Sequence, residues 1–242
     1  MKVLVVDIGG THVKALVSGQ RVARQFDSGP DLLPKNMVAG TNRLVDGWRY
    51  DVVSIGYPGP VLRSRPIAEP HNLGKGWVGF DFGKEFGRPV KVVNDAAMQA
   101  LGSYRGGKML FLGLGTGLGS ALVVDGIVEP MELSHLPYRE RTYEHYVGEK
   151  GLKRKGAAKW RRLVDDVVTR LVDALEPDDV VLGGGNARLL KKLPPKCRVG
   201  SNANAFLGGF RLWESSPGKA DGKRKRQDAK PTSAKGSGGQ AA

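Results

Sequence analysis

The repeated order of strand, glycine turn, strand and helix constrains the fold of this chain more than any other feature. In the first half, β-branched apolar strands are predicted over residues 2–9 and 11–17, on either side of a Gly-Gly pair. In the second half, strands over 108–112 and 120–124 flank a run in which glycine alternates with other residues. Because helices follow both rounds, the sequence predicts a duplicated α/β unit with a mixed sheet in each half.

The remaining periodic segments continue this alternation. Beyond residue 214 the composition turns to Gly, Ser, Ala, Pro and Lys without apolar periodicity, which predicts a disordered basic tail over 215–242. The other predicted helices are 31–48, 78–86, 95–104, 157–175 and 204–214, and the other predicted strands are 21–26, 51–57, 89–93 and 179–182.

Composition and charge limit the classes of function. A single cysteine, Cys197, leaves no internal disulfide and no cysteine-cluster zinc site. No apolar run is long enough for a membrane span or a signal peptide, so a soluble, cytoplasmic protein is expected. The formal net charge is +14, only partly in the tail, and favours an anionic partner such as phosphates, polyphosphate or, less readily, nucleic acid.

Three glycine runs follow apolar strands and suit phosphate binding, because glycine lets backbone N–H groups approach an anion. The run over 113–119 matches neither a Walker loop nor a dinucleotide fingerprint. The first pair alone also fits a hairpin turn capped by Asp7, and the third also fits a strand-to-helix turn. The candidate phosphate- or nucleotide-binding residues are Asp7, Gly9, Gly10, Thr11, Gly115, Thr116, Gly117, Gly119, Gly183, Gly184 and Gly185. Asp7 is also the candidate carboxylate for a Mg²⁺ held through water.

Polar residues at the end of the strand over 89–93 and after the second hairpin suit a polyol acceptor. Asp95 is positioned to accept a proton from a hydroxyl, although Asn and Asp are also common helix N-caps. Glu132 and His135 can both bind vicinal sugar hydroxyls, with Glu144 as a third contact. An ordinary surface pair and an exposed helix start explain these three residues equally well.

In chain order these elements resemble the ROK family (repressors, open reading frames and kinases), and within it the polyphosphate glucokinase-like branch. Ser134 departs from the glycine in the family's Glu-x-Gly-His motif, and the family's cysteine-rich zinc segment is missing. The motifs that carry the resemblance are Asp7-Ile8-Gly9-Gly10-Thr11, Ile55-Gly56-Tyr57-Pro58-Gly59, Asn72-Leu73, Asn94-Asp95-Ala96, Leu114-Gly115-Thr116-Gly117-Leu118-Gly119, Glu132-Leu133-Ser134-His135 and Leu182-Gly183-Gly184-Gly185.

The resemblance implies an α/β fold of the duplicated actin-like (ribonuclease H-like) type, with two lobes and an interlobe cleft. The N-terminal lobe is expected to comprise residues 1–107 plus 200–214, and the C-terminal lobe residues 108–199. The family often forms dimers, so a homodimer is an expectation. No structural zinc, no membrane and no specific nucleic acid are expected.

The implied activity is that of a hexose kinase, transferring a phosphoryl group from polyphosphate or ATP, with Mg²⁺, to a sugar hydroxyl such as the 6-hydroxyl of glucose. Asp95 would be the catalytic base, and the first two glycine loops would hold phosphates. The sugar-binding residues would be Gly59, Asn72, Asn94, Asp95, Glu132, His135 and Glu144.

Two other classes of function remain open from the sequence. A catalytically weak or inactive sensor of sugar or polyanion would keep the same fold, and a structural protein that binds polyphosphate or nucleic acid would use charge alone. The segment 150–162 holds seven basic residues and no acid. It is either a track for a long polyanion or the solvated face of an amphipathic helix.

Overall fold

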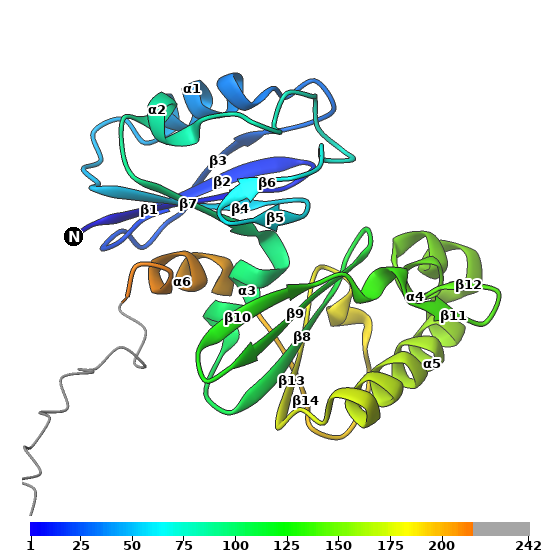
Figure 1. Ribbon diagram of the computed structural model, residues 1–242. Coiled ribbons are helices and arrows are strands. Elements are labelled where there is room, and N and C mark those ends of the chain that lie inside the picture. The colour runs from blue at the N-terminus through cyan, green and yellow to red at the C-terminus, as the bar shows by residue number, and fades with distance from the viewer. Residues whose placement is uncertain (215–242) are drawn as a thin grey trace, which may run out of the picture.

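The computed structural model describes residues 1–214, and the predicted tail over 215–242 lies outside the described residues. The chain forms two five-stranded mixed sheets with helices on both faces of each (Figure 1). The first sheet has the order β3 (Arg24–Asp27), β2 (His12–Val17), β1 (Val3–Ile8), β4 (Val52–Tyr57) and β7 (Val90–Asn94). The second has the order β10 (Ile127–Met131), β9 (Leu118–Val124), β8 (Lys108–Leu114), β13 (Asp179–Gly183) and β14 (Cys197–Val199).

The two sheets share one design. In each, the first strand of the round pairs antiparallel with the next strand of the chain and parallel with a later one, as β1 does with β2 and β4, and β8 with β9 and β13. This confirms the duplicated α/β unit. Each glycine turn lies in the hairpin between the two antiparallel strands, so the repeated sequence pattern has the same structural meaning in both halves.

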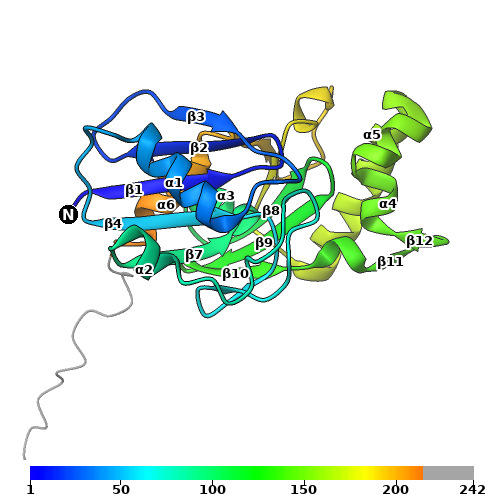
Figure 2. The same ribbon diagram turned by 90° about the horizontal axis from the view of Figure 1, so that it is seen from above.

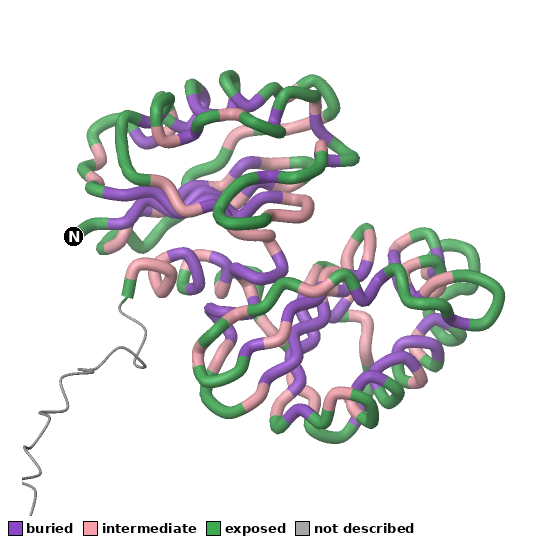
Figure 3. The backbone as a smooth tube through the Cα atoms, viewed as in Figure 1, coloured by how far each residue is buried: buried purple, intermediate pink, exposed green. Residues whose placement is uncertain are grey.

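Helices cover the outer faces of the sheets, and two more lie between them (Figures 1 and 2). Buried residues follow the strands and parts of the helices (Figure 3), and most of these buried residues are apolar. The helices are α1 (Pro34–Leu44) and α2 (Phe82–Phe86) on the first sheet, α4 (Tyr143–Val147) and α5 (Glu149–Leu175) on the second, and α3 (Asp95–Ser103) and α6 (Asn204–Arg211) in between. Short elements complete the chain: β5 (Val61–Leu62), β6 (Arg65–Pro66), β11 (Pro137–Tyr138), β12 (Arg141–Thr142), and the 3₁₀ turns η1 (Leu133–His135) and η2 (Ala187–Leu189).

Several predicted boundaries are wrong for identifiable reasons. The second glycine loop is shorter than 113–119, because Gly113 and Gly119 face each other within the β8–β9 ladder. The long helix predicted over 157–175 is confirmed, but α5 also includes a preceding helical segment from Glu149, separated from it by a kink at Gly156 with φ 73° and ψ 157°. The strand β14 is missing from the prediction, since its three residues are too few for a periodic signal. No helix within residues 1–214 combines the length and the apolar character of a membrane span.

The two helices between the sheets meet backbone to backbone. A Cβ atom on Gly102 of α3 would lie 1.8 Å from the Asn204 carbonyl oxygen, and one on Gly208 of α6 would lie 1.8 Å from that of Met98. The hydroxyl of Ser54 on β4 donates to the carbonyl of Gly209 at 2.6 Å, which holds α6 on the first sheet. Glycine at these positions therefore sets how closely the two halves of the chain approach.

Replacing Gly208 with alanine should destabilise the protein by at least the ~1–3 kcal/mol typical of overpacking, because the clash is with backbone rather than a movable side chain. Urea unfolding measures this loss. Gly83→Ala in α2 is the matched control, since its nearest neighbour would lie at an ordinary 3.4 Å. Equal stability of the two variants would show that the α3–α6 contact yields without strain.

Candidate active site

A cavity of about 570 Å³ lies between the two halves of the chain, at the carboxyl ends of β1, β4 and β7 and beside the β8–β9 hairpin. In α/β sheets this end of the strands is the usual place for a ligand. The structure brings most of the predicted site residues together there. The predicted residues that line the cavity are Gly9, Gly10, Gly59, Asn72, Asn94, Asp95, Gly115, Thr116, Gly117, Gly119, Glu132, His135, Glu144 and Gly184.

Four predicted residues do not line this cavity: Asp7, Thr11, Gly183 and Gly185. Gly183 is buried at the end of β13, and Thr11 and Gly185 are exposed. Asp7 is partly buried, and its charge still acts on the cavity through its effect on Asp95.

The first glycine turn is tight and abuts a loop of its own lobe. The N–H of Gly9 donates to the carbonyl of His12 at 3.0 Å, which closes the β1–β2 turn. A Cβ atom on Gly10 would lie 3.3 Å from the Cβ of Asn72. Glycine here allows Asn72 to approach the loop, so the predicted phosphate and sugar residues of this lobe are neighbours.

The second and third glycine loops form one unit. Asn186 donates from its backbone N–H to the carbonyl of Leu114 at 2.9 Å, and from Nδ2 to that of Gly115 at 3.3 Å. Gly184 has φ +80°, and a Cβ atom there would lie 2.4 Å from the Leu114 carbonyl oxygen. The third loop therefore packs against the β8–β9 turn and is hydrogen-bonded to it through Asn186. Of its three glycines, only Gly184 lines the cavity.

The helix cap at the start of α3 belongs to Asn94 rather than Asp95. The Oδ1 atom of Asn94 accepts from the N–H groups of Ala96 at 2.9 Å and Ala97 at 3.2 Å, while its Nδ2 donates to the Gly59 carbonyl at 3.1 Å. Asp95 is the first helical residue, and its carboxylate accepts from the Ala96 N–H at 2.7 Å. With the cap supplied by Asn94, the Asp95 side chain lines the cavity.

The pKa of Asp95 is raised to about 7, first by burial and then by the negative charge of Asp7, against the opposing effect of the Ala96 N–H. Glu132 adds a smaller repulsion of the same sign. Burial likewise raises the pKa of Asp7, while Lys14, directly opposite it on β2, lowers it. Two carboxylates, Asp7 and Glu132, thus raise the pKa of Asp95, and a hard cation such as Mg²⁺ nearby would offset their negative charge.

The Glu132–His135 segment presents two exposed polar side chains. The η1 turn brings His135 Nε2 to 3.8 Å from Glu132 Oε2, with 73% of the His135 and 58% of the Glu132 side chain exposed. Ser134 is buried between them, and its φ is not in the left-handed region. Serine is therefore unstrained at the position where the family motif has glycine.

The α4 helix brings Glu144 close to the second glycine loop. A Cβ atom on Gly117 would lie 3.1 Å from Glu144 Oε1, so the absence of a side chain on Gly117 makes room for this carboxylate. A helix does start at Tyr143, but it is not an exposed one, since Tyr143 is buried, and Glu144 in its first turn lines the cavity.

Sequence reasoning missed four polar residues at this site. Lys14 acts on Asp7, and Glu69, His71 and Gln99 line the cavity. Gln99 lies one helical turn after Asp95, a spacing that predicts the same face, and its buried Oε1 has no hydrogen-bond partner. Within residues 1–214, no group of three or more His, Cys, Asp or Glu side chains gathers as metal ligands would.

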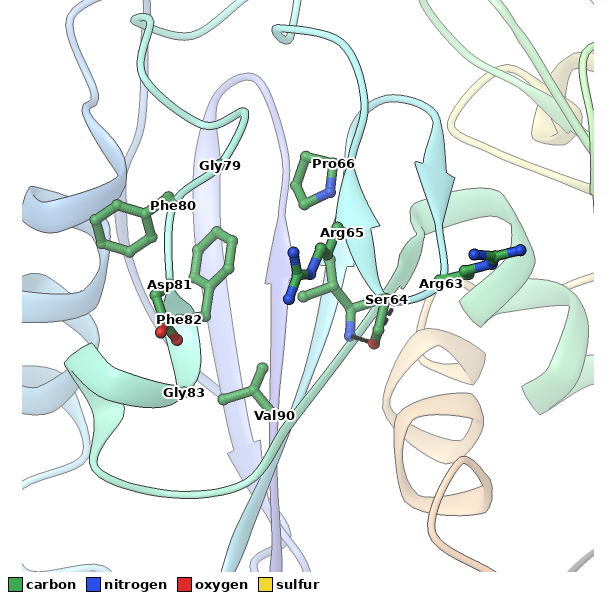
Figure 4. A pocket seen from close by; sticks show the side chains of 11 residues that line it. Arg63, Ser64, Arg65, Pro66, Gly79, Phe80, Asp81, Phe82, Gly83 and Val90 are labelled. Carbon is green, nitrogen blue, oxygen red and sulfur yellow. Dashed lines mark hydrogen bonds between the residues drawn. The ribbon is translucent and has the colours of Figure 1, made fainter.

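A second cavity, of about 360 Å³, lies beneath the β5–β6 hairpin and contains none of the predicted residues (Figure 4). Arg65 from the hairpin and Phe80 from the loop before α2 are on its walls. The hydroxyl of Ser64 accepts from the Val92 N–H at 2.7 Å and donates to the Val92 carbonyl at 3.2 Å. These bonds fasten the hairpin to the edge strand β7.

The raised pKa of Asp95 makes protein stability depend on pH. Between about pH 4 and pH 7 the unfolded chain has lost a proton that the folded chain retains, so the free energy of unfolding falls as pH rises through this window. Asp95→Asn removes this effect. We expect a higher Tm than the native chain at pH 8 and a smaller difference at pH 5, measured by thermal unfolding.

Asp173→Asn, at an exposed position on α5, is the control and should show no such trend. An Asp95→Asn variant that melts with the native chain at both pH values would mean that Asp95 titrates normally.

Comparison with known proteins agrees with this geometry. A polyphosphate glucokinase from Mycobacterium tuberculosis (strain CDC 1551 / Oshkosh) is 28% identical over 216 residues, covering 78% of this chain and 80% of that protein. The inorganic polyphosphate/ATP-glucomannokinase from Arthrobacter sp. strain KM superposes with a TM-score of 0.73 at 22% identity, covering 86% of this chain and 96% of that one. A ROK family glucokinase from Streptomyces griseus, crystallised with glucose and AMPPNP, gives 0.70 at 17% identity, covering 88% and 99%.

These structural matches confirm the actin-like two-lobe fold. The model of the ROK family matches residues 3–129, more than half of the sequence. The chain therefore belongs to the ROK family.

Proposed function

We propose that this chain is a sugar kinase that transfers a phosphoryl group from polyphosphate or ATP to a hexose hydroxyl, with the 6-hydroxyl of glucose as the preferred acceptor. The observation that carries the proposal is Asp95. Asn94 rather than Asp95 caps the helix, and the Asp95 carboxylate, which accepts from the Ala96 N–H, lines the cavity between the glycine turns and Glu132 and has its pKa raised to about 7. A base with that pKa is half ionised at neutral pH, which suits proton transfer from an alcohol.

In the proposed reaction, the sugar hydroxyl oxygen attacks the terminal phosphorus of the donor as its proton passes to Asp95. The bond from that phosphorus to the bridging oxygen breaks, and the shortened donor leaves. Such transition states are loose, so catalysis rests on positioning and on neutralising charge. Backbone N–H groups of Gly10, Thr116 and Gly117 would hold the phosphates, since those of Gly9 and Gly115 donate to carbonyls within their own turns.

Mg²⁺ would suit the negative charge that Asp7 and Glu132 place near Asp95. Asp7 would hold the ion through water. The positive charge of the ion would then offset the negative charge of Asp7 that acts on Asp95. When bound, the ion would neutralise charge on the phosphates. Lys14, opposite Asp7 in the ladder, would favour the ionised form of Asp7 against burial, which raises the pKa of Asp7.

The acceptor side would use Glu132, His135 and Glu144 for sugar hydroxyls, with Gly59 and Asn72 lining the pocket. Asn94 has its Oδ1 and one Nδ2 hydrogen engaged by the protein, so its contribution to the sugar would come from the remaining Nδ2 hydrogen. The relatives named for polyphosphate, ATP and glucose support this choice of donor and acceptor.

A coupled assay should pair glucose, mannose, N-acetylglucosamine and N-acetylmannosamine with ATP and with polyphosphate. We expect phosphorylation of glucose at least. Asp95→Asn should lower turnover by about 10²–10⁴-fold while sugar binding is nearly kept, as for loss of a general base. Absence of product from every pair would favour the sensor over the enzyme, and unchanged turnover in Asp95→Asn would remove Asp95 from the mechanism.

The pH dependence of the reaction should report the charge near Asp95. We expect kcat/KM to rise with pH around a midpoint of about 7, as Asp95 loses its proton. Asp7→Asn removes a charge that raises this pKa, so the midpoint should move to lower pH even if the plateau falls. An unmoved midpoint would assign the titration to another group, and Asp173→Asn should leave the profile unchanged.

A further inference from the structure

A third cavity lies away from the cleft, in a groove between α5 and the segment before β14. Its volume is about 560 Å³, and it shares no lining residue with the cleft. One wall is a stripe of α5 in which Arg161, Arg162 and Asp165 occupy neighbouring turns, and the other wall carries Lys191 and Lys192. We call this feature the basic groove; its lining residues are Ala158, Arg161, Arg162, Asp165, Lys191, Lys192, Leu193, Pro194 and Pro195.

The four cations of the basic groove are available to an anion. Among the described residues, no carboxylate oxygen lies within 4.0 Å of the charged groups of Arg161, Arg162, Lys191 or Lys192. Arg162 and both lysines are exposed. Arg161 is partly buried and donates from Nη1 to the Leu189 carbonyl at 3.4 Å, which ties the two walls together. The basic groove is therefore preformed and carries four positive charges and one negative charge.

The basic groove and the cleft are joined by one short segment of chain. Gly184 lines the cleft, and Lys191 lines the groove seven residues later. Seven residues span at most ~25 Å even when fully extended. A flexible anion much longer than a nucleoside triphosphate could therefore bind in the cleft and in the basic groove at once, with one end at the glycine loops.

The lining of the basic groove favours bare phosphates over nucleotides. Arg and Lys are the usual ligands of phosphate oxygens. Of the described residues that line the groove, none is aromatic, whereas single-stranded nucleic acid is held by stacking its bases on aromatic rings. An anion that carries regularly spaced charges and no bases matches this surface better.

We infer that the basic groove binds the distal phosphates of a long inorganic polyphosphate chain while the terminal phosphate lies in the cleft. This inference rests on the proposed kinase function for the cleft end of the chain. The groove then gives the protein a preference for long polyphosphate over tripolyphosphate, because only the long chain reaches both sites. It also identifies which part of the basic segment 150–162 contacts the polyanion, namely Arg161 and Arg162.

The test uses the full chain and the double variant Lys191→Glu/Lys192→Glu. We expect about tenfold weaker binding of fluorescently labelled long-chain polyphosphate at low salt, with a shallower dependence of affinity on salt. KM for long-chain polyphosphate should rise similarly, while KM for ATP and for tripolyphosphate should stay within about twofold. The matched control is Lys35→Glu/Arg43→Glu on α1, which changes net charge equally at exposed positions of the other lobe.

The outcomes separate the groove from the kinase activity. If both double variants lose the same amount of polyphosphate binding, the loss comes from net charge alone, and the inference that the basic groove is a polyphosphate site is refuted. Single-stranded DNA bound more tightly than polyphosphate, and lost in Lys191→Glu/Lys192→Glu alone, would overturn the choice of ligand. Turnover with an unchanged KM for long chains in that variant would refute the groove and leave the kinase standing. No turnover by the native chain, with binding still lost only in that variant, would refute the kinase and keep the groove as a polyphosphate site.

Discussion

The contact between α3 and α6 is the constraint on which the rest of the structure depends. α6 packs on the first sheet through residues such as Ala205, and α3 packs on the second through Ala96, Ala97 and Ala100. The two layers are held at backbone distance by glycine. Because α3 is a rigid rod of about two and a half turns, the contact at one end also fixes Asp95 at the other. The α3–α6 contact therefore fixes both how the two lobes are placed relative to each other and where the proposed base, Asp95, lies.

Carboxylates lie in and beside the cavity, although burial and their proximity make their ionised forms less favourable. The negative charges of Asp7 and Glu132 both raise the pKa of Asp95, and burial raises the pKa of Asp7 and of Asp95. Lys14 relieves only Asp7. Natural proteins break local rules of stability mainly at functional sites, where a ligand supplies what the empty site lacks. The charge pattern is more informative about function than the shape of the cavity.

The sequence predicts the strands and glycine turns well because β-branched runs and glycine are strong local signals. It places the ends of the second loop wrongly, since glycine is compatible with turn and strand alike, and the cross-strand pairing of Gly113 with Gly119 decides between them. Nor can it tell which of Asn94 and Asp95 caps α3. Both are good caps, and the choice depends on the Gly59 carbonyl, 35 residues away in the chain.

Loop residues such as Glu69 and His71 have no periodic signal at all, so only the folded chain reveals them in the cavity. The role of Asp95 as a base and the division of the chain into lobes at residues 107 and 200 stay predictions. The tail over 215–242 stays one as well, since it lies outside the described residues.

The Ser64 hydroxyl has a consequence for association between molecules. β7 is an edge of the first sheet, and an exposed edge strand offers unpaired N–H and carbonyl groups to strands of other chains. Ser64 occupies both groups of Val92 with a side chain, at the expense of a left-handed turn in which Arg63 and Ser64 have φ of 49° and 63°. The hairpin thus blocks this part of the β7 edge from pairing with a strand of another molecule.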